Sequence, residues 1–292
     1  MIVFMADGRL GNQIFQFAFL TGFAKKNEII FCINMKRFFD AFDCDSGNVI
    51  NCCNRYVIYL MRQVVIPYLI RPLANLRVFG YVEQVKYEDG IPHASYEYKK
   101  GGVPLSFVNT DFFQSESFFN LDSFCNKVKI KAQYLTTASQ FLSDIPLEYC
   151  RVFIHVRRGD YLNEKFMGER GIDLPNSYFF YAIKLIKSKV KNPFFIFLTD
   201  DPSYVERSFK EINSKIISKN SAAVDLAIMS LCDSGIISNS SFSWWGSALM
   251  KDKHVVVVPK YWYGWKQKID SHPNIYPSWG VVIDVKGTQS AF

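Results

Sequence analysis

RVFIHVRRGDYL, residues 151–162, joins an apolar run to a charged ending, and this combination decides the fold class. The run from Val152 to Val156 predicts a buried strand, and the polar residues after it predict a loop at the strand's carboxyl end. Similar strands and helices follow, and we expect strands at 151–157, 194–200, 215–218, 235–240 and 254–259 and helices at 176–190, 222–232 and 243–250. Strands that alternate with helices indicate a parallel sheet covered on both faces.

The start of the chain repeats this order on a smaller scale. Residues 2–34 contain a short apolar strand, a loop with glycines, a helix from about Asn12 to Lys26 and a second strand. From 34 to 145 the pattern is irregular and aromatic-rich, and it predicts no topology. A chain of 292 residues lies in the size range where one core tends to split into two. We therefore expect an α/β protein with two Rossmann-like domains, residues 1–145 and 146–292.

The net charge of +7 indicates an anionic partner, which could be nucleic acid, an acidic membrane surface or a phosphorylated small molecule. A nucleic-acid site would combine a basic stripe with aromatic residues. The one candidate stripe, residues 184–191, is typical of the exposed face of a helix instead. We therefore expect no nucleic-acid partner.

The cysteines bear on location and on metal binding. There are seven, without CxxC pairs, and the chain opens on the strand-like MIVFM rather than on a signal peptide, so we expect a cytoplasmic protein with reduced thiols. Four cysteines lie between residues 32 and 53, but their spacing matches no zinc site. The neighbouring pair Asp43 and Asp45 is typical of solvated loop acids. We therefore expect no bound metal.

Residues 56–77, YVIYLMRQVVIPYLIRPLANLR, form the most apolar long segment, interrupted by arginines and prolines. Two interpretations stay open. The segment can supply helices of the first domain whose arginine stems cover apolar surface. It can also lie as a basic amphipathic segment on an anionic membrane, which would place the protein peripherally on the inner membrane face.

Polar clusters follow the strands at the end where a parallel sheet binds its ligands. These clusters are HVRRGD at 155–160, LTDD at 198–201 and SNSSFS at 238–243, with GRLGNQ at 8–13 in the first half. In an open parallel sheet the ligand crevice lies outside the carboxyl ends of the strands. We therefore expect one ligand site that uses all four clusters.

Arg157 and Arg158 are the strongest candidates for binding an anion. Guanidinium groups present planar pairs of donors that match phosphate oxygens, and they keep their charge. Gly159 permits the turn that would bring both side chains to the same ligand. The alternative is an internal ion pair between Arg158 and Asp160 that shapes the loop.

The serines and aspartates of the other clusters have two interpretations each. Ser240, Ser241 and Ser243 lie between a strand and a helix, where hydroxyls and backbone N–H groups bind an anion or simply cap the helix. Asp200 and Asp201 end a strand, where they can hydrogen-bond a base or ribose or cap the next helix.

Three further residues complete the candidate site. Gly11 and Asn12 lie where a helix begins, so backbone can approach a ligand there and the amide can donate to it, although Asn12 can equally serve as a helix cap. The segment lacks the ending of a Walker loop and the third glycine of the dinucleotide fingerprint. Asp225 lies among apolar neighbours and needs a hydrogen-bond donor if it is buried.

Taken in order, GRLGNQIFQFA, HVRRGDY, FLTDD and DLAIMSLCDSGIISNSSFSWWGSAL resemble the α-1,2-fucosyltransferases of glycosyltransferase family 11, of bacterial type. The resemblance implies a glycosyltransferase-B-like architecture, in which two Rossmann-like domains face each other across a cleft. It implies GDP-fucose as donor substrate, no cofactor and no essential metal, inversion at the anomeric carbon, and a galactose-terminated oligosaccharide or lipid-linked glycan as acceptor. Arg9 stands where many members have glycine.

The resemblance also assigns roles. It makes Arg157 and Arg158 the ligands of the GDP diphosphate, where they act as catalytic groups, and His155 a donor contact. Asp160 is a candidate base, or it orients an arginine. More distant relatives of the family suggest the remaining donor-binding residues, which are Asp225 for guanine, Ser240, Ser241 and Ser243 for phosphate, and Asn12, Gly11, Asp200 and Asp201 near the diphosphate or sugar.

Two rival functions remain open at this point. One is another sugar-nucleotide transferase that uses the same donor pocket on a different acceptor hydroxyl. The other is a binding module for anionic ligands without catalysis, which would bind its ligand without turnover.

Overall fold

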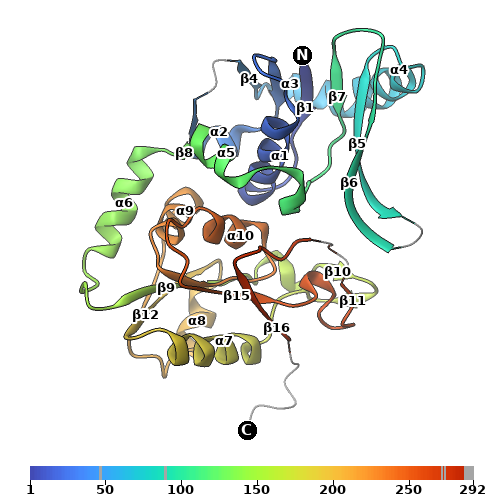
Figure 1. Ribbon diagram of the computed structural model, residues 1–292. Helices are drawn as coiled ribbons and strands as arrows, with labels where there is room; N and C mark the ends of the chain where they lie inside the picture. The colour runs from blue at the N-terminus through green and yellow to red at the C-terminus, as the bar shows by residue number, and fades with distance from the viewer. Residues whose placement is uncertain (46–47, 89–90, 271, 273, 286–292) are drawn as a thin grey trace. The chain divides into compact units, whose positions relative to one another are not determined.

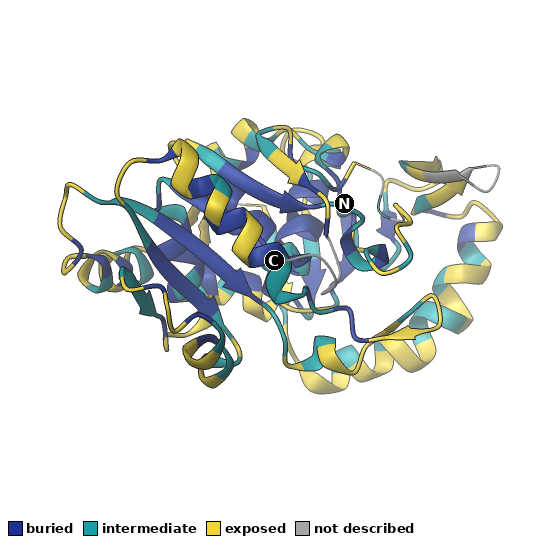
Figure 2. Ribbon diagram, turned by 90° about the horizontal axis from the view of Figure 1, so that it is seen from below, coloured by how far each residue is buried: buried dark blue, intermediate teal, exposed yellow. Residues whose placement is uncertain are grey.

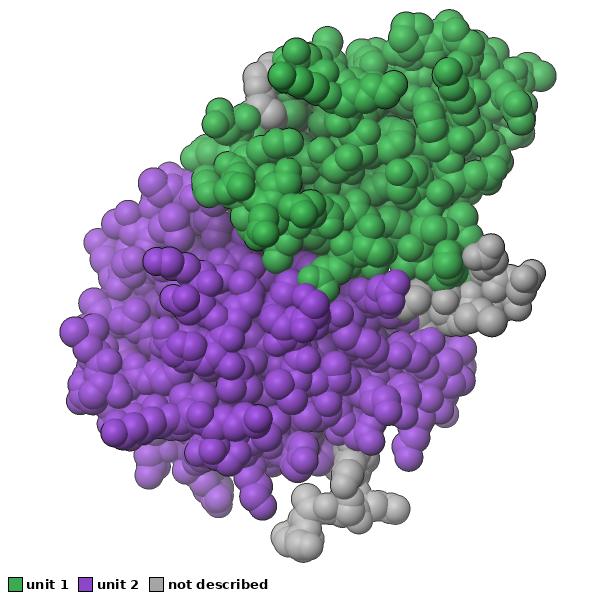
Figure 3. All heavy atoms as spheres, in the orientation of Figure 1, with its two compact units in different colours: residues 1–129 green, residues 130–292 purple. Residues whose placement is uncertain are grey.

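The computed structural model describes residues 1–45, 48–88, 91–270, 272 and 274–285. The chain divides into two compact units, Met1–Lys129 and Ile130–Phe292 (Figure 3). The division falls before the expected boundary at 145. The reason is that helix α6 (Ala132–Leu142) packs against α9 (Ala222–Ser230) and so belongs to the second unit (Figure 1).

The second unit is built on one parallel sheet with strand order β13-β12-β9-β14-β15-β16. Its strands are β9 (Cys150–Val156), β12 (Pro193–Thr199), β13 (Lys215–Ile217), β14 (Ser234–Ile236), β15 (Val255–Pro259) and β16 (Gly280–Ile283). The chain runs outward from β9 through β12 to β13, then returns to β14 beside β9 and runs outward the other way. This is the Rossmann order, and the switch point lies between β9 and β14.

Helices cover both faces of this sheet, as expected. In Figure 1, α7 (Asn176–Lys189) and α8 (Pro202–Ser208) lie on one side, and α9 and α10 (Ser241–Ala248) on the other. The strands and helices predicted from 151 to 259 are all present, with shifted ends. Unpredicted elements are η3 (Asp160–Leu162), the hairpin β10 (Lys165–Phe166) to β11 (Glu169–Arg170), α8, η4 (Trp262–Gly264) and β16.

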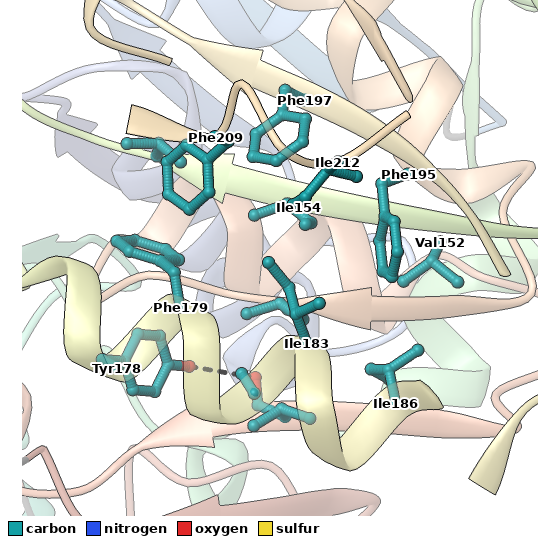
Figure 4. Packing of buried hydrophobic residues seen from close by; sticks show 14 of the residues in the cluster. Val152, Ile154, Tyr178, Phe179, Ile183, Ile186, Phe195, Phe197, Phe209 and Ile212 are labelled. Atoms are coloured by element: carbon teal, nitrogen blue, oxygen red, sulfur yellow. Dashed lines mark hydrogen bonds between the residues drawn. The ribbon is translucent and has the colours of Figure 1, made fainter. Parts of the chain in front are cut away.

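The core of the second unit forms where α7 packs against the central strands. Phe179, Ile183 and Ile186 of α7 share an apolar cluster with residues of β9 and β12 (Figure 4). The Tyr178 hydroxyl donates to the carbonyl oxygens of Ile237, at 2.7 Å, and Val257, at 3.4 Å. Figure 4 draws a hydrogen bond of this hydroxyl as a dashed line. This hydroxyl ties α7 to the strands beyond the switch point.

The first unit has its own sheet, of strand order β4-β2-β1-β7-β5-β6, in which β6 alone is antiparallel to its neighbour. Its strands are β1 (Ile2–Met5), β2 (Ile30–Ile33), β4 (Val49–Cys52), β5 (Gly80–Glu88), β6 (Ile91–Lys99) and β7 (Ser106–Val108). The predicted strand-helix-strand opening is β1, α1 (Leu10–Phe23) and β2. Most residues of β1, β2 and β7 are buried. Figure 2 shows buried strands in dark blue and the exposed faces of helices in yellow.

The segment without a predicted topology supplies the rest of the first unit. It contains α2 (Lys36–Ala41), β3 (Phe42–Cys44), α3 (Arg55–Leu60), the π-helix η1 (Met61–Ile70), α4 (Arg71–Asn75), η2 (Glu116–Phe118), α5 (Leu121–Lys127) and β8 (Val128–Ile130), besides β4 to β7. Its aromatic residues form the core here: Phe19 stacks on Phe113 with ring centroids 3.9 Å apart, and Phe17 lies 4.2 Å from Phe38.

Tyr178→Phe should lower the free energy of unfolding by about 1–2 kcal/mol, because the buried Ile237 carbonyl then loses its donor. Urea denaturation measures this effect. The matched control is Tyr181→Phe on the same helix, where the ring is 57% exposed, and it should stay within roughly 0.5 kcal/mol of wild type. Equal losses in the two variants would contradict the role of the Tyr178 hydrogen bonds.

Candidate functional site

Two arginines directly follow β9, the central strand of the second unit. Arg157 forms ion pairs with Asp160 and with Asp200, where Nη1 lies 2.8 Å from Oδ2. The Arg157 side chain is only 15% exposed, so these pairs are partly desolvated and well ordered. Asp160 therefore pairs with Arg157 and not, as the internal-pair alternative supposed, with Arg158.

Arg158 is held by different partners. Its Nη1 lies 3.2 Å from Asp173 Oδ2 and its Nε lies 3.4 Å from Asp201 Oδ2. Its guanidinium also stacks over the ring of Tyr204, 3.6 Å from the centroid. Counting both arginines, two cations share four carboxylates at this strand end. The carboxylates hold the guanidinium groups in fixed positions.

Gly159 makes this arrangement possible. A Cβ at this position would lie 2.5 Å from Asp200 Oδ2, so any other residue would push that carboxylate away. The backbone N–H of Arg158 donates to the other oxygen of Asp200, at 2.9 Å. The predicted role of the glycine, permitting a turn, is thus joined by a second one, permitting the close approach of Asp200.

His155 joins the two strands at the switch point. Its Nδ1 lies 2.8 Å from Ser238 Oγ, in the loop that follows β14. Burial lowers the pKa of His155 to about 4, with Asp200 opposing the shift. The imidazole is therefore neutral at pH 7 and connects β9 to the β14–α10 loop through a hydrogen bond.

The serines of that loop divide into two kinds. Ser240 caps α10 by accepting from the backbone N–H of Phe242, at 3.4 Å, and Ser241 opens the helix with a partly exposed side chain. Ser243 is fully buried, and its hydroxyl accepts from the Ser238 N–H and donates to the Ser240 carbonyl. In this structure Ser243 therefore holds the loop, and its expected phosphate contact stays a prediction.

Asp201 and Asp225 both lie where helices begin. Asp201 caps α8 by accepting from the Tyr204 N–H at 3.0 Å, as its capping interpretation predicted, and it also pairs with Arg158. Asp225 lies in the first turn of α9 and accepts from Ser218 Oγ at 2.5 Å, which is the donor that its apolar surroundings required. Burial raises the pKa of Asp225 to about 6.

Several residues at this edge escaped the sequence analysis. Asp173 and Tyr204 hold Arg158, and the half-buried Tyr161 donates to the Asn239 carbonyl at 3.3 Å and contacts the Tyr263 hydroxyl at 3.2 Å. Of these residues, only Asn239 belongs to one of the polar clusters that follow the strands. Only the position of Tyr161 directly after HVRRGD was a usable signal.

Gly11 and Asn12 belong to the first unit. Gly11 is buried inside α1, and Asn12 accepts from Gln114 Nε2 at 2.8 Å. Gly8 has φ +80°, and a Cβ there would lie 2.5 Å from Asn12 Nδ2. Asn12 and Gln114 follow β1 and β7, which adjoin at the switch point of that sheet, so these residues form a polar edge of the first unit.

Within the described ranges, no group of three or more histidine, cysteine, aspartate or glutamate side chains is placed to hold a metal ion. All seven cysteines are free thiols.

With the geometry known, comparison with other proteins becomes informative. The chain is 25% identical over 303 residues to the O-antigen biosynthesis glycosyltransferase WbnK of Escherichia coli, covering 90% of this chain and 95% of that protein. It is 27% identical over 282 residues to an alpha-1,2-colitosyltransferase of Escherichia coli, covering 90% and 92%.

Solved structures agree on the fold. The fucosyltransferase NodZ from Bradyrhizobium matches with a TM-score of 0.54 at 12% identity, covering 85% of this chain and 92% of that chain. The strand order and this likeness confirm the glycosyltransferase-B-like α/β class.

The family model for glycosyl transferase family 11 matches residues 82–282, which is more than half of the chain. The match includes most of β5 and all of β6 to β8, in the segment for which no topology was predicted. It also includes every polar cluster of the second unit. The chain belongs to glycosyl transferase family 11.

Proposed function

We propose that this glycosyltransferase transfers L-fucose from GDP-fucose to O2 of a terminal galactose, with inversion and without a metal ion. The observation that carries the proposal is the pair Arg157 and Arg158, held by carboxylates at the carboxyl end of β9, beside the switch point. The likeness to NodZ, an α-1,6-fucosyltransferase solved after soaking with GDP-fucose, supports this donor.

The donor diphosphate binds to the two arginines and the start of α10. A guanidinium has five N–H donors, and the ion pairs of Arg157 use Nη1 and Nη2. Phosphate oxygens therefore share or exchange these donors with Asp160 and Asp200. Ser240 and Ser241 stand at the start of α10, where the helix dipole favours an anion.

Asp225 recognises guanine. The N1–H and the 2-amino group of guanine are adjacent donors, and an ionised carboxylate accepts from both. Because burial raises the pKa of Asp225 to about 6, the free enzyme ionises this group at a cost that two strong hydrogen bonds then offset.

The reaction uses the arginines as the charge partner of the leaving group. As the bond between fucose C1 and the β-phosphate oxygen lengthens, negative charge grows on that phosphate. The fixed guanidinium groups stabilise this charge without reorganising, which is the main source of catalysis in such sites. The acceptor hydroxyl forms its bond to C1 from the opposite face, and its proton passes to a base.

Asp160 is a positioning residue in this mechanism. Its carboxylate is already paired with Arg157, and this ion pair holds the guanidinium in position. The loop arrangement thus favours the orienting role over the role of base.

The likeness to a colitosyltransferase supports a second candidate, transfer of colitose to the same type of acceptor. Colitose is fucose without its 3-hydroxyl group. A site built to hydrogen-bond that hydroxyl rejects the deoxy sugar strongly, whereas a site without such partners accepts both sugars. Rates with GDP-fucose and GDP-colitose on one galactoside, with the product linkage determined by NMR, decide between them.

The relative WbnK supports a proposal for the acceptor. WbnK acts in O-antigen biosynthesis, and O-antigen intermediates are glycans carried on lipid. A galactose-terminated glycan of this type is the proposed acceptor, and the enzyme works in the cytoplasm. If GDP-fucose binds but no galactoside yields product, the acceptor assignment fails while the donor assignment stands.

Arg157→Ala and Arg158→Ala should each slow fucosyl transfer to lactose about 10²–10³-fold, and excess EDTA should leave the wild-type rate unchanged. GDP release and product formation measure the rate. The control is Arg207→Ala, an exposed arginine of α8 outside the site. Turnover that requires added metal would contradict charge stabilisation by arginine alone.

Asp225→Asn should weaken GDP binding at least about tenfold and should favour xanthosine diphosphate, whose 2-oxo group accepts from the asparagine amide. Calorimetric titration with the two nucleotides measures the exchange of preference. Loss of both nucleotides without exchange would indicate that Asp225 does not contact the base.

The pH dependence of wild type offers a separate check. Because the pKa of Asp225 is about 6 in the free protein, GDP affinity should fall as pH drops through 6, where the carboxylate loses an acceptor.

The free energy of unfolding of the unliganded protein depends on the same group in the opposite direction. Since burial raises the pKa of Asp225, its contribution to this free energy increases as pH falls through 6. Asp225→Asn should raise the free energy of unfolding above pH 6, by roughly 1–3 kcal/mol, and this gain should vanish toward pH 4.

Asp160→Asn should retain most activity, because asparagine Oδ1 still accepts from Arg157, whereas Asp160→Ala should raise the KM for GDP-fucose. Steady-state kinetics of both variants separates the roles. A loss of kcat by about 10²–10⁴ in Asp160→Asn, with donor affinity unchanged, would identify Asp160 as the base instead.

A further inference from the structure

One helical segment of the first unit exposes many apolar side chains to solvent. It runs from Arg55 to Asn75 through α3, η1 and α4, and among the described residues it is the one helix long and apolar enough to cross a membrane by length and composition. Almost none of it is buried. A helix with this composition needs a partner for its outward face.

The inward face of the helix is accounted for. Met61, Ile66, Ile70 and Leu73 pack, together with Ala74, against an apolar cluster that contains Phe79, Tyr81 and Phe107. The helix is therefore part of the first unit and lies along its sheet. This packing favours a helix that rests on a surface over one that leaves the fold to span a bilayer.

The outward face carries tyrosines and aliphatic residues. Exposed fractions reach 86% for Tyr56, 68% for Tyr59 and 72% for Tyr68, and the other exposed members are Leu60, Val64 and Leu69. Spacings of three and four in α3, then of four and five in the wider η1, keep these residues on one side. We call these six residues the tyrosine surface.

The charge around the tyrosine surface is of one sign. Residues 46–82 contain no aspartate or glutamate and no lysine, but they contain Arg55, Arg62, Arg71 and Arg77, and all four arginines are exposed. Arg62 also pairs with Asp7 after β1, with Nη2 3.3 Å from Oδ1. The middle of the helix therefore adjoins the polar edge of the first unit.

We propose that the tyrosine surface and its four arginines form a peripheral docking site for a bilayer that contains anionic lipids. Tyrosine rings suit the headgroup region because one end is apolar and the other polar. Exposed arginines attract anionic headgroups, and Arg55, Arg71 and Arg77 add to this attraction more than Arg62, which is paired with Asp7. The charge complementarity selects a lipid surface over a second copy of this chain, because copies would bring these arginines together.

The site does not depend on the proposed reaction, since it concerns binding alone. It would, however, hold the polar edge of the first unit close to headgroups, where a glycan on a lipid carrier is presented. Activity and membrane binding can therefore fail separately.

Co-sedimentation of the full chain with vesicles tests the proposal. We expect binding to phosphatidylcholine vesicles that contain phosphatidylglycerol, weak binding to phosphatidylcholine alone, and release at high salt. Arg55→Gln and Arg77→Gln should each weaken binding about fivefold, and Tyr59→Ser with Tyr68→Ser should weaken it further. The matched controls are Tyr181→Ser and Lys184→Gln on α7, which should leave binding unchanged.

The named side chains are exposed, so the variants should keep the wild-type melting temperature and the affinity for GDP. Binding that is equal for neutral and anionic vesicles, or that the α7 controls reduce as much, would overturn the proposal. So would self-association without lipid that the tyrosine substitutions abolish, because the occupant would then be a second copy. Binding that persists at high salt with protease protection of the helix would show insertion and would also overturn it.

Discussion

The site depends on one constraint, which is that β9 is hydrogen-bonded to strands on both sides and covered by helices on both faces. A strand in that position can carry charge only where it ends. Within it, His155 is tolerated because burial keeps the imidazole neutral and Ser238 supplies a hydrogen-bond partner. The two arginines follow immediately, at the first place where water and carboxylates can reach them.

The carboxylates explain how two adjacent guanidinium groups stay in place without a ligand. Like charges that close would repel, and four aspartates offset the repulsion. Asp160 and Asp173 lie between β9 and α7, and the adjacent Asp200 and Asp201 follow β12. Because the ion pairs already hold both guanidinium groups in position, these groups need not reorganise when negative charge develops on a bound ligand. Burial raises the pKa of Asp225 to about 6, so hydrogen-bond donors of a ligand would favour the ionised carboxylate.

The fold of the second unit was largely predictable. Each of its central strands is a continuous apolar run, and each run ends in a polar cluster, so order and type followed from periodicity. The compact units divide before residue 145 because α6 packs against α9, and this contact cannot be read from the sequence of α6. In the first unit, β5 and β6 carry many polar residues and the core is made of clustered phenylalanines, which have no diagnostic period.

The sequence by itself determined that the chain is a two-unit α/β protein of family 11 and that the strand ends carry its polar residues, because periodicity and motifs are local properties. Only the tertiary structure decided which carboxylate pairs with which arginine, that Ser243 is buried in its own loop, and that residues 55–75 expose tyrosines. Ion-pair partners come from segments far apart in the chain. Burial depends on what packs against a residue, and neither property is written in the neighbouring sequence.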